Sequence, residues 1–408
     1  MARAEKKEKL KKKNNMRSDR SVRAKSKHAT DKNGLLSDVG GIFAGFDYVT
    51  LALVLLLTAF GVIMVFSASY YTTVNLSDDA LFYLKRQMFF ALTGLVVLVF
   101  FANFDYHRYY KLGNLLMVTS ITLLVLVLLV GINVNGATRW LGFGSFRITP
   151  SEFSKLFMII WTSVFLASDP DNICTQKGLL LLFGVMIVHF GLIFKQPNLS
   201  TAIVIAAIMV AIMIVAGLNL WWIGGFAGLG ALGGFVILNF MKDTHWYSRL
   251  TNWMDPFADS QGEGYQVSQS IIALGNGGIK GLGFGNSVSK NLYLPEPQND
   301  FILAVIGEEL GFIGFVILMI VYVFLLYRLI LIALKAKDRL GFYLATGVAV
   351  LLGLQVIINI AVVTASMPAT GITLPFISYG GTSLWVFMAA IGISLNVSRY
   401  GKGKKADR

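Results

Sequence analysis

The sequence contains few cysteines and histidines, the residues that form disulfides and many metal sites. Among its 408 residues there is one cysteine, Cys174, and there are only four histidines. One cysteine cannot form an intrachain disulfide, and its spacing from the histidines does not match a zinc site. Charged residues are also scarce, at 14% of the chain, whereas 55% are hydrophobic and the mean hydropathy is +0.67. A soluble domain does not have this composition, so the sequence predicts an integral membrane protein.

Apolar runs long enough to cross a bilayer recur along the chain. A helix needs about 20 apolar residues to cross roughly 30 Å of hydrocarbon. Runs of this kind begin near Tyr48, Gln87, Leu112, Phe153, Lys177, Leu199, Leu218, Phe301, Gly341 and Thr382. The predicted fold class is therefore an all-α polytopic membrane protein, with about ten transmembrane helices in residues 47–398.

Positive charge is concentrated at the start of the chain. Residues 1–46 are rich in Lys and Arg, contain no apolar run and hold most of the formal net charge of +13. We interpret them as a disordered cytoplasmic arm that lies near anionic membrane lipid, and we expect no nucleic-acid partner. With this arm inside the cell, ten crossings place the 399–408 tail in the cytoplasm and a large loop, 242–300, outside between helices 7 and 8.

The 242–300 loop is polar and glycine-rich, but it also contains Trp, Tyr and Phe. A connection this long is typical of a working surface or of disorder, and its aromatic residues favour a working surface. Asp300 ends the loop, where the N-terminus of the next helix favours a carboxylate. Glu308 and Glu309 lie about 12 Å deeper, and we expect hydrogen bonds to neighbouring helices to stabilise them. The glycines of 281–285 follow no predicted strand, so they indicate tight turns against the membrane surface and not a dinucleotide site.

Polar residues near the fourth helix indicate a cavity. Arg139 has two interpretations of equal weight, an interfacial anchor and an anion-binding group. Thr149 and Glu152 have the spacing of a capping box, in which Thr149 is the N-cap and Glu152 reaches back to it. Lys155 lies three residues beyond Glu152, and a charged pair at this depth has to face a protein cavity. The sequence therefore predicts a polar cavity beside this helix.

Two further polar features have more modest interpretations. Thr382 is expected to cap the last helix, and the glycines before it leave backbone N–H groups open in a geometry suited to phosphate. His189 lies within a predicted span. We expect it to be a neutral side chain bonded to a neighbouring helix.

Five motifs, taken in order, resemble the SEDS family of shape, elongation, division and sporulation proteins. They are Gly-Ala-Thr-Arg-Trp (136–140), Pro-Ser-Glu-Phe-Ser-Lys (150–155), Gly-Tyr-Gln-Val-Ser-Gln-Ser (264–270), Leu-Pro-Glu…Asp-Phe-Ile…Gly-Glu-Glu-Leu-Gly (294–311) and Leu-Pro-Phe-Ile-Ser-Tyr-Gly-Gly (374–381). The resemblance extends from about residue 47 to residue 399. The basic arm and the overall pattern are nearest the division branch of the family, and a sporulation or elongation paralogue stays an alternative.

The resemblance implies a peptidoglycan glycosyltransferase in the bacterial cell membrane, active at the division septum. Such an enzyme polymerises lipid II, the undecaprenyl-pyrophosphate-linked disaccharide peptide, together with a class B penicillin-binding protein and other divisome proteins. The family's essential aspartate corresponds to Asp300, and the residues that line its cavity correspond to Arg139, Glu152 and Lys155. One departure is Asn198, where the family commonly has Asp, although Asn can still cap a helix.

The reaction sets its own requirements on the residues. A base has to take a proton from the acceptor hydroxyl as it attacks an anomeric carbon, and we predict Asp300 for this role. The departing pyrophosphate gains negative charge, which fixed cations stabilise. The predicted substrate-binding residues are Arg139, Glu152, Lys155, Lys290, Glu296 and Ser378. A divalent cation, Mg²⁺ or Mn²⁺, would suit the same leaving group, but the sequence has no compact carboxylate cluster that fixes one, and no metal ligands are predicted.

Two other functions fit the same sequence. A lipid II flippase could use intramembrane polar residues to bind a headgroup in transit, although no internal inverted repeat is evident. A non-catalytic scaffold could recruit a class B penicillin-binding protein through the loop. Loss of Asp300 would then leave function unchanged.

Overall fold

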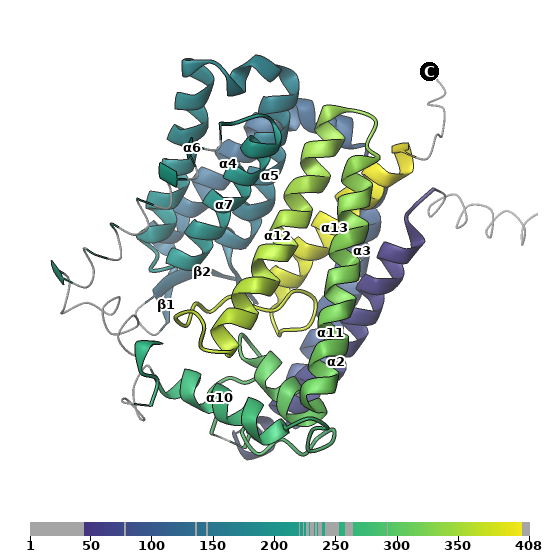
Figure 1. Ribbon diagram of the computed structural model, residues 1–408, viewed down its shortest axis with the longest axis vertical. Coiled ribbons are helices and arrows are strands. Elements are labelled where there is room, and N and C mark those ends of the chain that lie inside the picture. Colours follow the sequence, from purple (N-terminus) through teal and green to yellow (C-terminus); the bar gives the residue numbers. More distant parts are fainter. Residues whose placement is uncertain are drawn as a thin grey trace, which may run out of the picture. The chain divides into compact units, whose positions relative to one another are not determined.

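A computed structural model describes residues 45–76, 79–134, 137–143, 146–219, 264–291 and 293–401, together with 253–257 and isolated residues between 221 and 240. The chain divides into two units, 1–46 and 47–408. The second unit is a bundle of long helices with a small sheet at one end (Figure 1). Its helices are α2 (Tyr48–Leu76), α3 (Phe82–Asn103), α4 (Tyr109–Val130), α5 (Pro150–Ser168), α6 (Gln176–Phe194), α7 (Leu199–Val215), α10 (Tyr265–Gly277), α11 (Ile302–Leu334), α12 (Arg339–Val363) and α13 (Gly381–Gly401).

The helical membrane fold agrees with the prediction. In the part of the chain that is described, seven helical segments are long and apolar enough to cross a membrane, and α7 is a shorter apolar helix. Nine of the ten predicted spans correspond to a helix that begins within five residues of the expected position. The span expected near Leu218 falls mainly on residues outside the description, as do most of the 1–46 arm and much of the 242–300 loop, so the count of ten helices stays a prediction.

Burial separates the central helices from those that face lipid. Most residues of α5 and α13 are buried, including Trp161 and the run from Val386 to Ser398. By contrast, α3 exposes a row of apolar side chains, among them Leu92, Val96 and Phe100. Exposed apolar side chains on the outside of a helix bundle are what a bilayer environment requires. The bundle therefore has a protein-packed centre that can tolerate polar residues.

Polar contacts join the ends of several helices at the end of the bundle where α13 finishes. The Tyr106 hydroxyl donates to Asp338 Oδ2 at 2.8 Å, and His107 Nε2 lies 2.9 Å from the same oxygen. Arg399 Nη1 donates to Asn103 Oδ1 at 3.0 Å. Arg399, which the sequence analysis places with the tail in the cytoplasm, therefore lies at the same end of the bundle as His107. Which side of the membrane this is stays a prediction.

A three-stranded antiparallel sheet lies between α4 and α5, and the sequence did not predict it. It consists of β1 (Ile132–Val134), β2 (Ala137–Phe143) and β3 (Phe146–Ile148), in the order β1-β2-β3. In the middle strand, Trp140 pairs with Ile132 and Leu141 pairs with Ile148. The two outer strands have three residues each, too few for alternating apolar and polar positions to be recognised in a sequence. The sheet gives Arg139, in the middle of β2, a fixed backbone.

Helix α11 is broken at Gly311, where φ is 67° and ψ is −171°. Such a break leaves backbone groups without helical partners, and the 278–283 segment supplies partners for them. Leu282 N donates to Glu308 O at 3.0 Å and Gly283 N donates to Glu309 O at 2.9 Å. The amides of Phe312 and Ile313 donate to the carbonyls of residues 278 and 279 at 2.9 and 3.2 Å. The glycine turns therefore pack against the break in α11, and their expected position at the membrane surface stays a prediction.

Candidate active site

The predicted site residues lie on segments that meet at the end of the bundle opposite the end of α13. Figure 1 shows β1, β2 and α10 at this end, next to the loop that precedes α13. Backbone and side-chain hydrogen bonds connect these segments to each other, and the contacts of each predicted residue show which segments it joins.

Arg139 is anchored to the turn between α6 and α7. Its Nε donates to Gln196 O at 3.2 Å, and its Nη2 donates to Pro197 O. Gln196 is itself buried, and its amide nitrogen donates to Leu124 O at 3.1 Å in α4. The guanidinium is therefore held in place by backbone carbonyls of a tight turn. A side chain that only anchors the protein at the membrane interface would not need these two hydrogen bonds.

Glu152 and Lys155 form an ion pair on the first turns of α5. Lys155 Nζ donates to Glu152 Oε1 at 2.7 Å, with both side chains largely shielded from solvent. The pairing overturns the predicted capping box. Thr149 is the N-cap residue and Pro150 follows at the first helical position, but Thr149 makes no side-chain cap bond and Glu152 does not reach back. The nearby ammonium offers Glu152 a charge-assisted bond, which is stronger than a bond to a backbone amide.

Asn198 occupies the N-cap position of α7, but its side chain does not cap that helix. Its amide nitrogen instead donates to Ser151 Oγ at 3.4 Å. Asn198, which stands where the family commonly has Asp, therefore connects the α6–α7 turn to the start of α5. Through this link, the turn that holds Arg139 adjoins the helix that carries Glu152 and Lys155.

Asp300 lies directly before α11, where Phe301 and not Asp300 is the N-cap residue. Its side chain is partly exposed. Its carbonyl oxygen accepts a 2.7 Å hydrogen bond from the amide nitrogen of Asn359 in α12, which also donates to Ile372 O at 2.8 Å. Two residues earlier, Gln298 O accepts a 2.9 Å bond from Tyr379 N. The candidate base is therefore attached to the 364–380 segment at two points.

The two glutamates of α11 are bound by the loop and, in addition, by one neighbouring helix each. Glu308 accepts from Ser287 Oγ at 2.5 Å, from Ser289 Oγ at 3.1 Å and from Ser289 N at 3.2 Å. Glu309 accepts from Lys290 Nζ at 2.7 Å and from Ser67 Oγ of α2 at 2.6 Å. The expectation of helix partners holds for Ser67 of α2 and for Asn276 of α10, whose amide nitrogen donates to Glu308 Oε1 at 3.4 Å. The loop therefore reaches the buried part of α11 that carries both carboxylates.

Lys290 is buried and makes three hydrogen bonds with its ammonium group. Besides Glu309, these bonds go to Ser67 Oγ at 3.1 Å and to Gly285 O at 2.8 Å. An ammonium has three N–H donors, so all of them are used within the protein. In this conformation the lysine balances the charge of Glu309.

Glu296 and Ser378 lie in different surroundings. Glu296 is exposed, its φ of 45° is in the left-handed region, and its carboxylate accepts from the Asn299 amide. Ser378 is buried, and its Oγ accepts a 2.8 Å bond from Leu374 N, which closes the turn before α13. The exposed carboxylate is on the surface of the loop, whereas the serine stabilises a turn.

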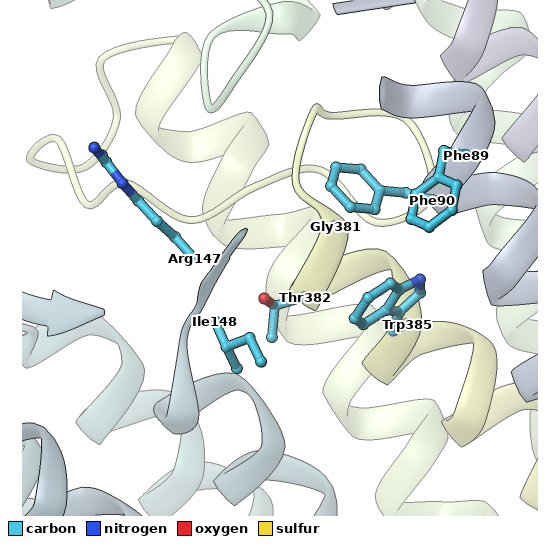
Figure 2. Close-up of a pocket in the computed structure, with 7 residues that line it drawn as sticks. All are labelled: Phe89, Phe90, Arg147, Ile148, Gly381, Thr382 and Trp385. Carbon is cyan, nitrogen blue, oxygen red and sulfur yellow. The ribbon is translucent and has the colours of Figure 1, made fainter. Parts of the chain in front are cut away.

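A cavity of about 280 Å³ opens beside the start of α13. It is lined by Phe89, Phe90, Arg147, Ile148, Gly381, Thr382 and Trp385. Figure 2 shows the aromatic rings and Ile148 on opposite sides, with the Arg147 guanidinium directed away from the rings. Thr382 is inside the helix, which begins at Gly381, and its Oγ1 accepts a 3.4 Å bond from Thr149 N. Thr382 therefore links α13 to the start of α5, and it is not the expected cap.

His189 is buried and has a partner for each ring nitrogen. Nδ1 lies 2.9 Å from Val185 O in its own helix, and Nε2 lies 3.0 Å from Ser120 Oγ in α4. The expected bond to a neighbouring helix is present. Ser120 in turn donates to Ser154 Oγ of α5 at 2.9 Å, so this polar chain joins three helices.

The sequence interpretation missed Asn359. An amide side chain within a predicted membrane span was the available signal, because such a group needs hydrogen-bond partners in a membrane. Among the described residues, no three His, Cys, Asp or Glu side chains gather closely enough to hold a metal ion.

Comparison with known proteins gives consistent matches over most of the chain. The model of the FtsW, RodA and SpoVE family, described as cell cycle protein, matches residues 47–403. Stage V sporulation protein E of Bacillus subtilis is 42% identical over 87% of this chain and 98% of its own length. The probable peptidoglycan glycosyltransferase FtsW of Trichlorobacter lovleyi is 39% identical over 87% of this chain and 93% of its own length.

Two solved structures also match. Rod shape determining protein RodA of Thermus thermophilus has a TM-score of 0.65 and 28% identity, covering 88% of this chain and 98% of that one. A chain from a study named "Structural coordination of polymerization and crosslinking by a peptidoglycan synthase complex" has a TM-score of 0.71 and 29% identity. That match covers 88% of this chain and 99% of the other.

Proposed function

The chain belongs to the FtsW, RodA and SpoVE family of cell cycle proteins, and on this premise we propose that it polymerises lipid II into glycan strands during septal cell-wall synthesis. Relatives that are 33–39% identical over most of the chain carry the name probable peptidoglycan glycosyltransferase. The chain is then a multi-pass enzyme of the bacterial cell membrane. Its termini lie in the cytoplasm and its polar loops face the cell wall.

The observation that supports this proposal most is the set of hydrogen bonds made by the segments around α13. The 364–380 segment binds the backbone at Asp300 through Asn359, and it binds Gln298 through Tyr379. The helix that follows it contacts the start of α5 through Thr382 and Thr149. A carboxylate and the Glu152–Lys155 pair are thus carried by segments that are bonded together at one end of the bundle. Polymerisation requires a base and fixed cations in one region.

The chemistry assigned to these residues is a single displacement. The Asp300 carboxylate takes the proton of the acceptor sugar hydroxyl, whose oxygen forms a bond to the anomeric carbon of the donor. The bond from that carbon to the pyrophosphate oxygen breaks, and the anomeric configuration inverts. Arg139 and Lys155 stabilise the negative charge that develops on the pyrophosphate. Glu152 holds the ammonium of Lys155 in place.

We also propose a class B penicillin-binding protein as the partner, since a matched solved chain comes from a study of a peptidoglycan synthase complex. A partner that forms peptide crosslinks would act on the glycan strand as it leaves the polymerase. The two proteins would then work on one nascent product.

The test is to reconstitute the full chain and this partner in vesicles that contain fluorescent lipid II. The length of the glycan strands and the movement of lipid II between leaflets are measured in parallel. We expect strands from wild type, none from Asp300→Ala, and no lipid movement above that of protein-free vesicles. Lipid movement without strands would support a flippase, and equal strand formation by wild type and Asp300→Ala would contradict the catalytic assignment.

A further inference from the structure

Asn359 is a buried polar group whose contacts are both directed at the candidate site. It lies in α12, one turn after the buried Gln355 in a stretch of mainly apolar residues, and its side chain is fully buried. An amide in this environment is unfavourable unless its hydrogen-bonding groups find partners. Its partners are the backbone carbonyls of Asp300 and Ile372, at 2.7 and 2.8 Å.

Only the donor side of this amide is used within the described part of the chain. An amide nitrogen has two N–H groups, and each has one carbonyl partner here. The Oδ1 atom accepts no hydrogen bond from a described residue. The contribution of Asn359 is therefore to hold two carbonyl groups from two different segments at a fixed separation. A side chain of similar shape without these donors cannot do this.

The position of the Asp300 carbonyl group determines which part of the site Asn359 can influence. It belongs to the peptide unit between Asp300 and Phe301, directly before α11 begins at Ile302. The Cα of Asp300 belongs to this peptide unit, so holding the unit in place restricts where the Asp300 side chain leaves the backbone. Because Asp300 is not the N-cap residue of α11, helix geometry alone does not fix it. The bond from Asn359 supplies a constraint at this residue.

We infer that Asn359 is a positioning residue for polymerisation, which holds Asp300 at the correct place and orientation by binding its carbonyl group. This inference rests on the proposed function of Asp300. Asn359 is buried, so it acts through Asp300 and does not bind substrate. Removal of its donors should slow proton transfer and leave the binding of lipid II unchanged. Displacement of a reacting group by about 1 Å can cost on the order of 100-fold in rate.

The test compares Asn359→Leu with a matched variant at the other end of the bundle. Asn396 in α13 is also a buried asparagine that joins a helix to a neighbouring backbone, donating to Ala102 O at 2.8 Å and accepting from Tyr106 N at 3.0 Å. A purely structural effect should be similar for Asn359→Leu and Asn396→Leu. The full chain is assayed with its partner for kcat and KM of lipid II polymerisation, together with its thermal unfolding midpoint.

We expect Asn359→Leu to lower kcat by about 10- to 100-fold with KM within about twofold, because the base is displaced while binding is retained. Asn396→Leu should lower the unfolding midpoint by a comparable amount and keep kcat within about twofold at a temperature where it is folded. If Asn359→Leu does not fold, Asn359→Ser keeps one hydroxyl donor in place of two, and a smaller loss of kcat is expected.

Wild-type kcat in the folded Asn359 variant would overturn the inference, as would an equal loss of kcat in Asn396→Leu. Asp300→Ala, assayed alongside, separates this result from the proposed function. If Asp300→Ala retains turnover, the proposed base is wrong. If it has none while the Asn359 variant has wild-type kcat, only the positioning role is wrong.

Discussion

The buried pair of Lys290 and Glu309 gives the most direct test of how the loop is held to the bundle. Replacing Lys290 with Met keeps most of the side-chain stem and removes the ammonium. Glu309 would then lose the partner that lies 2.7 Å from its Oε1 and would keep the hydrogen bond from Ser67 at 2.6 Å. The carboxylate would remain buried with no cation bonded to it.

The expected loss of stability follows from the burial of the pair. Only 6% of the Lys290 side chain and 0% of the Glu309 side chain are exposed. Removing one partner of a buried ion pair costs about 3–5 kcal/mol, because the other charge is left uncompensated. In Lys290→Met/Glu309→Gln both charges are absent, and the Gln oxygen can still accept from Ser67. We expect this double variant to be within about 1–2 kcal/mol of wild type, the loss from one or two hydrogen bonds.

The assay is a reversible denaturant titration of the full chain in detergent micelles, read out as the free energy of unfolding. Lys85→Met is the matched control, because Lys85 and Asp79 form an ion pair of 2.8 Å in which 63% and 46% of the side chains are exposed. An exposed pair contributes about 0–1 kcal/mol. The reasoning would be refuted if Lys290→Met cost no more than Lys85→Met, or if the double variant were as unstable as the single one.

The double variant also separates two roles for Lys290. If the lysine only balances Glu309, polymerisation should return together with stability. If the double variant is folded but inactive, at least one of the two charges has a part in the reaction, as the sequence predicts for Lys290.

Two further predictions concern the break in α11 and the anchored arginine. Gly311→Ala should destabilise the fold by about 1–3 kcal/mol or more, because φ at this position is 67° and a Cβ would lie 2.2 Å from Gly281 N. Gly184→Ala, which has open space around the new Cβ, is the control in the same titration. Equal free energies of unfolding for the two variants would contradict the account. Arg139→Gln should lower kcat for lipid II polymerisation by about 10-fold or more with a smaller effect on folding, because the negative charge that develops on the pyrophosphate loses a cation. Arg139→Lys should restore kcat only partly, since an ammonium lacks the planar fork of the guanidinium. Wild-type kcat in both variants would remove Arg139 from the site.

The helical framework could be predicted from the sequence, because each span is a long apolar run. The predicted starts near Tyr48 and Leu199 coincide with the first residues of α2 and α7, and the start expected at Gln87 is five residues late. In that helix, Lys85 and Arg86 interrupt the hydrophobic run but not the backbone, so hydropathy places the boundary too deep. A run of apolar residues locates a span well and its first turn less well.

The arrangement within the site could be predicted only in part. The motifs indicated Glu152 and Lys155 as a pair in a protein-lined position, and they are paired. The capping-box spacing at Thr149 was misleading, because it shows which bonds Glu152 can reach but not that a lysine one turn away offers a stronger one. The same limit applies to Lys290, whose partner Glu309 lies two residues before the break in α11. A periodic hydrophobic pattern indicates a regular helix, and it does not show where the helix backbone breaks or which loop residues contact it there.

The central claim is that the Asp300 carboxylate removes the proton from the acceptor hydroxyl. Its most direct test is the rate of glycan polymerisation by Asp300→Asn, with the partner present and with lipid II binding measured separately on the same preparation. We predict binding within about twofold of wild type and a polymerisation rate lower by about 100- to 10,000-fold, since the amide keeps the shape of the side chain but cannot accept the proton. A rate within tenfold of wild type would contradict the account.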